Sequence, residues 1–269
     1  MHPVTRKTDD LVAWVNDVLI RLWMNPDARV RDGLFVEELD RTGMPLEAGF
    51  FRTVVCARQA YFFLRSSRAL GDEMSAMGLQ LTDLLCTAFV DRKHGGFVKR
   101  LDRDGSVLDD RKDLYTYAFV IFALAEAHRH ARAAHHLQVA ADLLEQVRDR
   151  FWNQALGAYN AVLSADFADV LEPPAQNPHM HLFEALDALC SSTGTQDHAL
   201  GLADLAAVVL KTFWSDEAVA MMELPSHQSD NWIEPGHQFE WYALALGTSD
   251  AEARSMMSDR VSAAFRKCL

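Results

Sequence analysis

Two histidines, each followed three residues later by a glutamate, are the residues in this chain best suited to chemistry. His181 with Glu184 and His237 with Glu240 both occur in the pattern His-x-Phe-Glu, and a proline precedes each pair where a helix would begin. Residues three apart share one face of a helix, so each imidazole is expected beside its carboxylate. An imidazole that titrates near neutral pH next to a carboxylate is suited to proton transfer.

The surroundings of these pairs refine the expectation. Asn177 is expected to cap the helix that carries His181, with the following proline at its first position. His179 and His181 would then lie about 200° apart around that helix, so they are not expected to share a metal ion. Trp241 beside Glu240 at a helix start is typical of a pocket wall rather than of a core.

Two further residues have open interpretations. Arg58 stands in an otherwise apolar helical segment, so it requires either a structural ion pair or a ligand. Tyr115 begins another helix and lines either a cavity or the core. A second group of histidines falls in a polar junction between two helices and is expected at the solvated surface: His128, His130, His135 and His136.

Composition limits the classes of partner. The chain has 269 residues and a formal net charge of −12, so neither nucleic acid nor an anionic membrane is expected as a partner. Its four cysteines are scattered without CxxC spacing, as is typical of free thiols in a reducing compartment. No apolar run reaches membrane-spanning length, and the N-terminus lacks the pattern of a leader. We therefore expect a soluble cytoplasmic protein.

An internal repeat predicts the fold. The segment 33–43 matches 95–105 at an offset of 62 residues, and a further step of 62 reaches Gly157. Phe89, Phe151 and Phe213 keep the same period. Repeats of this length, each with two helices and a short strand, are typical of stacked helical hairpins. Helices are expected over 8–24, 50–70, 73–90, 111–130, 134–151, 178–192, 197–213, 236–247 and 250–267, with strands near 34–39 and 96–101.

Several motifs, taken in order, resemble the N-acylglucosamine 2-epimerase family, whose members include mannose isomerases and cellobiose 2-epimerases. They are Ala57-Arg-Gln-x-Tyr61, Gly95-Gly-Phe, Lys112-Asp-Leu-Tyr115, Asn177-Pro-His-Met-His-Leu-Phe-Glu184 and Glu234-Pro-Gly-His-Gln-Phe-Glu-Trp241. The resemblance implies an all-α fold of the (α/α)6-toroid type with short β-hairpins at one rim. Over residues 1–269 we expect one such domain, incomplete at about four to five of six hairpins and lacking the family's last third.

The resemblance also implies an activity. Members of the family interconvert sugars at C1 and C2 through a cis-enediolate, without a cofactor or metal. His237 would be the base or acid, oriented by Glu240, and His181 with Glu184 would serve ring opening or a substrate hydroxyl. Arg58 would hold the enediolate oxygen. Contacts to the sugar would come from Asn177, Tyr115 and Trp241.

One departure from the family pattern leaves an alternative open. The resemblance implies a further catalytic histidine late in the chain, whereas His237 is the last histidine here. The favoured function is mannose–fructose isomerisation or N-acylglucosamine 2-epimerisation; the alternative is a truncated, non-catalytic member that binds sugar or is inactive. The last two helices would also expose apolar residues, which predicts a homo-oligomer or an aggregation-prone monomer: Ala243, Leu244, Leu246, Met256, Met257, Val261 and Phe265.

Overall fold

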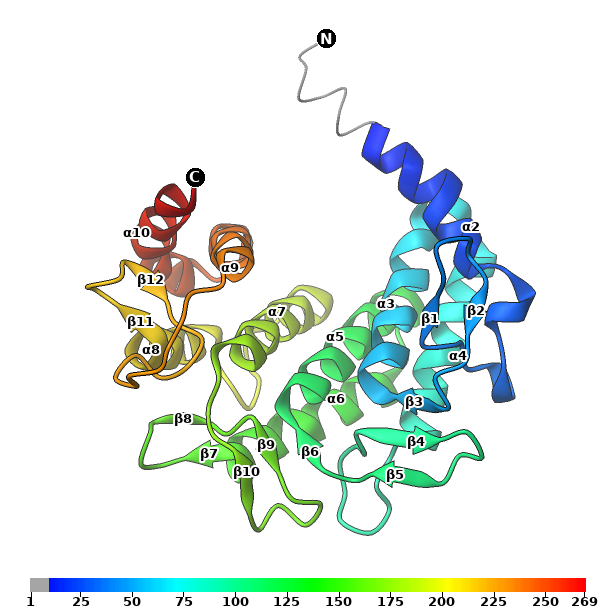
Figure 1. The fold of residues 1–269 in the computed structure, drawn as a ribbon, viewed down its shortest axis with the longest axis horizontal. Coiled ribbons are helices and arrows are strands. Elements are labelled where there is room, and N and C mark those ends of the chain that lie inside the picture. The colour runs from blue at the N-terminus through cyan, green and yellow to red at the C-terminus, as the bar shows by residue number, and fades with distance from the viewer. Residues whose placement is uncertain (1–9) are drawn as a thin grey trace.

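A computed structural model describes residues 10–269, and it is built mainly of antiparallel helical hairpins that follow an arc (Figure 1). The expected helical repeat is therefore confirmed. A short helix, α2 (Ile20–Trp23), precedes the hairpins. The paired helices are α3 (Thr53–Leu70) with α4 (Asp72–Ala88), α5 (Leu114–Ala131) with α6 (Ala134–Gln146), α7 (Gln176–Thr193) with α8 (Leu202–Phe213), and α9 (Pro235–Gly247) with α10 (Ala251–Cys268).

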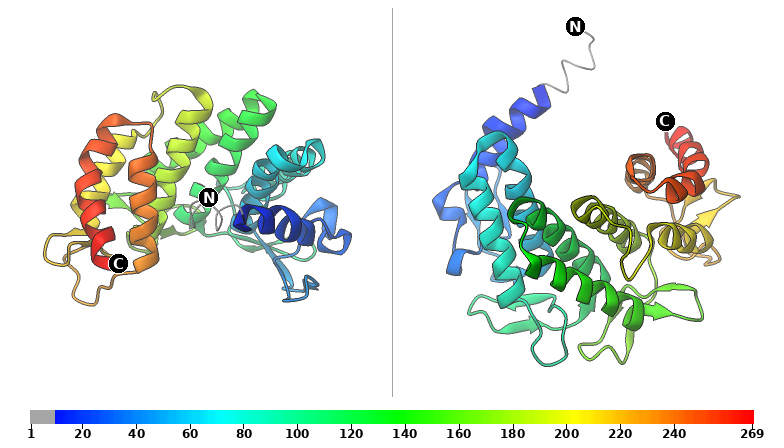
Figure 2. Two further views of the ribbon diagram at one scale, coloured as in Figure 1. Left: turned by 90° about the horizontal axis from the view of Figure 1, so that it is seen from above. Right: turned by 180° about the vertical axis from the view of Figure 1, so that it is seen from behind.

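The helices form two layers, as Figures 1 and 2 show together. The first helix of each hairpin (α3, α5, α7, α9) lines the inner side of the arc, and the second lies outside it. One apolar core runs between the layers from Ile20 to Val261. It includes Phe89, Phe151 and Phe213, which all have a relative exposure of 0%. The 62-residue period thus returns a buried phenylalanine at the end of three successive hairpins.

Short strands form one rim of the arc, and every pairing among the described strands is antiparallel. The expected strands near 34–39 and 96–101 are shorter than predicted, because only their last residues pair regularly. The sheets are β1 (Glu38–Leu39) with β2 (Pro45–Leu46); β3 (Phe50–Arg52), β4 (Arg100–Asp102) and β5 (Val107–Asp109); β6 (Lys112–Asp113), β9 (Val162–Leu163) and β10 (Val170–Glu172); β7 (Trp152–Asn153) with β8 (Ala158–Tyr159); and β11 (Trp214–Ser215) with β12 (Ala220–Met221).

The backbone repeats with the period of the sequence. Val90 bridges Phe97, Trp152 pairs with Tyr159 and Trp214 pairs with Met221, so the same small hairpin recurs every 62 residues. Its last turn residue has a positive φ each time, which favours glycine. The residues and angles are Gly95 at 81°, Gly157 at 64° and Val219 at 49°. The fourth repeat therefore keeps the left-handed turn although a β-branched residue has replaced the glycine.

The last hairpin is better packed than the sequence suggested. Met257 and Val261 are buried, at 0% and 1% exposure, which corrects the expectation that they face solvent. Phe265 stacks on Tyr242 with ring centroids 4.2 Å apart. Leu246 is exposed, as expected. The apolar surface of α9 and α10 is accordingly smaller than predicted.

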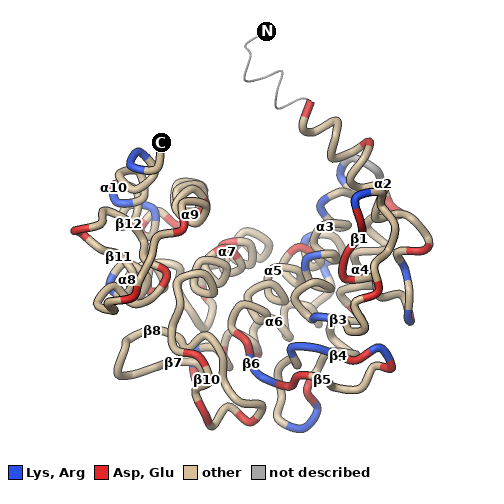
Figure 3. The backbone as a smooth tube through the Cα atoms, in the orientation of Figure 1, with Lys and Arg blue, Asp and Glu red and all other residues tan. Residues whose placement is uncertain are grey.

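Charged side chains occur along the whole arc. Acidic residues lie on α7 and α9 and on the rim strands β5, β6 and β10, in both arms of the structure (Figure 3). The formal net charge of the whole chain is −12. In the described part of the chain, no helix has the length and apolar character needed to cross a membrane.

Candidate active site

Three of the expected site residues line one cavity on the inner side of the arc. Arg58 on α3 and His181 and Glu184 on α7 surround a space of about 550 Å³. The wall between them is aromatic and includes Phe119 and Phe122 of α5. A cavity of this size with a few convergent polar groups is typical of a small-molecule site.

His181 is held in a defined orientation. Its Nδ1 lies 3.0 Å from Oε2 of Glu184, one turn along α7, as the spacing predicted. The ring of Tyr115 approaches the imidazole edge-on at 5.1 Å between centroids, and that of Phe119 lies at 4.7 Å. A carboxylate accepts hydrogen bonds, so Nδ1 donates and Nε2 is left as the nitrogen that can take up a proton.

Arg58 supplies an uncompensated positive charge. Its guanidinium carbon lies 5.2 Å from the centroid of Phe119, in a cation–π contact. Among the described residues no carboxylate lies within ion-pair distance of it, so the structural salt bridge that the sequence left open is not formed. The planar guanidinium keeps its donors for a ligand in the cavity.

His179 has a structural function that explains the second histidine of the motif. Its Nδ1 lies 2.7 Å from the carbonyl of Ala175, and its Nε2 accepts from the amide of Tyr159 at 3.0 Å. Burial lowers its pKa to about 4. It is fully buried and anchors the hairpin β7–β8 to α7, so His179 and His181 point apart, as expected.

The same anchor recurs in the neighbouring repeats. The Tyr117 hydroxyl accepts from the amide of Phe97 at 3.3 Å, and Oε1 of Gln238 accepts from the amide of Met221 at 2.9 Å. Two residues after each anchor stand Phe119, His181 and Glu240, on the inner helices α5, α7 and α9. Phe119 and His181 line the cavity, so the repeat places Glu240 on the concave side of the arc.

His237 has a different partner from the one predicted. Its Nδ1 lies 2.8 Å from Oε1 of Glu223, in the segment between β12 and α9, whereas Glu240 is exposed and makes no ion pair among the described residues. Burial raises the pKa of Glu223, and the hydrogen bond to His237 opposes this. His237 is half-buried and is not among the residues that line the cavity around His181.

Charged side chains from three other helices affect the pKa of Tyr115. Burial raises the pKa of Tyr115; the charge of Arg58 opposes this, and the charges of Glu240 and Glu184 add to it. Residues from α3, α5, α7 and α9 are therefore within electrostatic reach of one tyrosine. Tyr115 does not line the cavity itself, but its ring contacts that of His181.

Two expected sugar contacts have other positions. Trp241 is fully buried, and its ring centroid lies 5.8 Å from that of Phe183. It follows Glu240 directly on the helix, so its side chain points about 100° away from that of Glu240, toward the core. Asn177 is not the helix cap: α7 begins one residue earlier, with Ala175 preceding it as the cap. The Oδ1 atom of Asn177 is buried and has no hydrogen-bond partner among residues 10–269.

Several cavity residues were not assigned a function from the sequence. Glu37 lines the cavity and accepts from the backbone amide of Arg52 and from its Nε, each at 2.6 Å. Tyr61 stacks on Phe122 at 4.2 Å, and burial raises its pKa. Gln59 and Tyr61 belong to the motif around Arg58, which was a usable signal. Glu37 had no such signal, because only the fold brings its loop to α3.

The histidines between α5 and α6 are less solvated than expected. His128 and His136 are buried, at 9% and 2% exposure, which corrects the sequence interpretation for both. His135 is exposed, and His130 lies 3.4 Å from Oε1 of the buried Glu126. The ring of His128 lies against the turn from α5 into α6, 3.3 Å from the carbonyl of Ala133, and that of His136 faces Asp83 of α4.

Comparison with known proteins supports the resemblance. The family described as N-acylglucosamine 2-epimerase (GlcNAc 2-epimerase) matches residues 33–266. A mannose-6-phosphate isomerase from Rhizobium meliloti is 31% identical over 252 residues, which cover 88% of this chain and 62% of that protein. A D-mannose isomerase from Thermobifida fusca is 29% identical over 226 residues, which cover 78% of this chain and 52% of that protein. The chain thus spans between half and two thirds of the length of these relatives.

Solved structures show the same fold. A cellobiose 2-epimerase from Bacillus thermoamylovorans superposes with a TM-score of 0.81 over 98% of this chain and 72% of that one, at 16% identity. A D-mannose isomerase structure superposes with a TM-score of 0.78 over 94% and 68%, at 22% identity. The arc of four hairpins therefore has the fold of part of an (α/α)6 barrel. By the extent of the sequence match and by its fold, the chain belongs to the N-acylglucosamine 2-epimerase family.

Proposed function

We propose that this protein is a sugar isomerase or epimerase that acts at C1 and C2 of an aldose. The observation that carries the proposal is the cavity in which Arg58, His181 and Glu184 meet. A histidine oriented by a carboxylate can move a proton, and an unpaired arginine can hold a developing oxyanion. The substrate classes named for its relatives, mannose above all, are the first to test.

The proposed step is a proton transfer next to a carbonyl. An imidazole removes the proton from C2, the electron pair forms the C1=C2 bond, and the carbonyl oxygen becomes the oxyanion of a cis-enediolate. Arg58 stabilises this oxyanion. Return of the proton to C1, with transfer of the hydroxyl proton from O2 to O1, gives the ketose; return to the other face of C2, with O1 again a carbonyl oxygen, gives the epimer.

Two histidine–carboxylate pairs are available for this chemistry. His237 does not line the cavity around His181, so its assignment follows the family resemblance: we assign the transfer at C1 and C2 to His237, oriented by Glu223. We assign ring opening or proton exchange with a hydroxyl to His181, oriented by Glu184. Tyr115, Asn177 and Glu240 are proposed to contact the sugar. Trp241 is removed from that group because it is fully buried.

Deuterium exchange tests the proposal. D-mannose, D-fructose and N-acetylmannosamine are each incubated with the protein in D2O, and label at C1 or C2 is followed by NMR while products are separated by chromatography. Arg58→Ala, His181→Gln and His237→Gln are each expected to lower the rate by about 10²-fold or more. His227→Ala, an exposed histidine, is the control. Binding of a sugar without any exchange would support a non-catalytic sugar-binding protein instead.

The cellular location and the oligomeric state complete the proposal. We place the protein in the cytoplasm because all four cysteines are free thiols. We also propose a homo-oligomer through α9, where Phe239 and Leu246 are each 38% exposed. Light scattering over a range of concentrations tests this, and a mass equal to that of one chain throughout would contradict it.

A further inference from the structure

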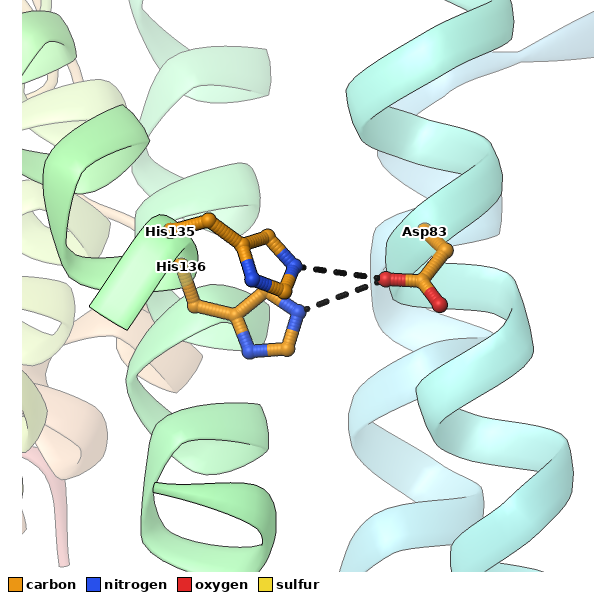
Figure 4. A group of neighbouring side chains, drawn as sticks. All are labelled: Asp83, His135 and His136. Carbon is orange, nitrogen blue, oxygen red and sulfur yellow. Dashed lines mark ion pairs between the residues drawn. The ribbon is translucent and has the colours of Figure 1, made fainter. Parts of the chain in front are cut away.

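A side-chain cluster on the outer layer lies apart from the cavity. Asp83 comes from α4, and His135 and His136 come from the first turn of α6 (Figure 4). Nε2 of each histidine lies 3.5 Å from Oδ1 of Asp83, and the three ligand atoms all lie within 4.8 Å of one another. The carboxylate therefore faces two imidazole nitrogens across the gap between two adjacent hairpins.

These separations suit a shared ion better than direct hydrogen bonds. Two ligands bonded to one tetrahedral metal at about 2.0–2.1 Å lie roughly 3.4 Å from each other. A hydrogen bond between the same atoms would be shorter, near 2.8 Å. His136 is only 2% exposed, yet neither of its ring nitrogens has a hydrogen-bond partner in the part of the chain that the structure describes. A buried imidazole without partners is costly, and coordination through Nε2 would satisfy it.

The donor set indicates the class of ion. Two imidazole nitrogens and one carboxylate oxygen suit Zn²⁺ and its transition-metal neighbours, whereas Mg²⁺ and Ca²⁺ prefer oxygen ligands. The side chains of Asp83 and His135 are 64% and 59% exposed, so an ion can enter from solvent and keep water in the remaining position. The amino end of α6 opposes a cation, and the Asp83 carboxylate offsets that charge.

We propose that Asp83, His135 and His136 bind one divalent transition-metal ion of the Zn²⁺ class that joins α4 to α6. The ion would link the outer helices of two successive hairpins, at a place that does not line the sugar cavity. Its function is structural: it ties one repeat to the next on the convex side, where inner-helix packing does not reach.

Cobalt provides a direct test, because tetrahedral Co²⁺ absorbs visible light while Zn²⁺ does not. The metal-free protein is titrated with CoCl2, and Zn²⁺ is then added to displace the signal. Asp83→Asn and His135→Ala change exposed side chains, so both variants are expected to fold, and each is expected to weaken Co²⁺ affinity by about tenfold or more. His227→Ala and Glu73→Gln are the matched controls, from an exposed loop and from α4.

A stability measurement separates this site from the histidine pairs near the cavity. Zn²⁺ should raise the melting temperature of the parent protein and of both controls, and this rise should be lost in Asp83→Asn and His135→Ala. Equal Co²⁺ affinity and an equal Zn²⁺-induced rise in all five proteins would overturn the proposal, because the metal would then be bound elsewhere.

Discussion

His237 donates a hydrogen bond from Nδ1 to Oε1 of Glu223 over 2.8 Å, although the two residues are 14 positions apart in the chain. Glu223 follows β12, and the left-handed turn at Val219 brings that strand back toward α9. The orienting carboxylate is thus supplied by the rim hairpin and not by the helix of the histidine itself. Glu223, and not Glu240, is therefore the carboxylate that is hydrogen-bonded to His237.

Replacing these glutamates one at a time tests which of them orients His237. Glu223→Gln should lower the isomerisation rate by at least about tenfold, because the ring loses the charge that fixes its tautomer and stabilises its protonated form. Glu240→Gln should lower it less and mainly raise KM, since Glu240 is proposed to contact the sugar. Steady-state kinetics with D-mannose measures both, and a larger loss of kcat in Glu240→Gln would reverse the assignment.

Val219 occupies a turn position that its repeat partners fill with glycine. A β-branched residue at a φ of 49° is strained. Val219→Gly removes this strain, which should raise the free energy of unfolding by about 1 kcal/mol. The greater conformational entropy of glycine in the unfolded chain offsets part of that gain. Urea denaturation measures the change.

The reverse change one repeat earlier is the control. Gly157 has a φ of 64°, and a Cβ atom added there meets no atom of the described residues within 4 Å. Gly157→Val should cost about 1–2 kcal/mol through the backbone alone. Equal stability of the parent and Gly157→Val would show that the turn tolerates any residue and would remove the basis for the first variant.

Acid should destabilise the fold through His179. Its pKa is lowered from 6.5 to about 4 by burial, so between these values the unfolded chain binds a proton that the folded chain does not. Stability contributed by this group is complete above pH 6.5 and falls by roughly 3 kcal/mol as the pH is lowered to 4. His179→Gln should flatten that slope while keeping both hydrogen bonds, as Gln238 does in the next repeat. An unchanged slope would exclude His179 as its source.

A buried ion pair should dominate the stability of the rim beside α5. Nζ of Lys112 is fully buried and lies 2.5 Å from Oδ2 of Asp91. Asp91→Asn keeps the turn contacts to the amides of Lys93 and His94 but leaves the ammonium unpaired, so it should cost about 3–5 kcal/mol. Asp149→Asn, which breaks an exposed pair with Arg148, should change the stability far less than Asp91→Asn does in the same denaturation experiment.

Periodicity made most of the fold predictable. Helix positions followed from apolar spacing and from the 62-residue repeat, because both reflect contacts within one hairpin or between neighbours. The strands were harder, since each pairs over only two or three residues and their ends depend on the partner. The helix expected over 134–151 also differs from the observed one, because its last turn, Val147–Phe151, is a π-helix that follows α6.

The candidate site was predictable only where it is local. His181 and Glu184 were paired correctly because they share a helix face. Glu223 and Glu37 were missed because tertiary structure alone brings them to His237 and to the cavity. Trp241 was misplaced because the pattern around Glu240 does not show which neighbour turns inward.

The rim strands connect the first three inner helices of the arc. β3, just before α3, pairs with β4 ahead of α5; β6, just before α5, pairs with β9 ahead of α7. The starts of α3 and α5 are thus tied to the following repeat, so opening one of these hairpins loosens mainly its two neighbours. Amide hydrogen exchange should accordingly be slowest in α5, which packs between α3 and α7, and unfolding should spread inward from either arm instead of occurring in one event.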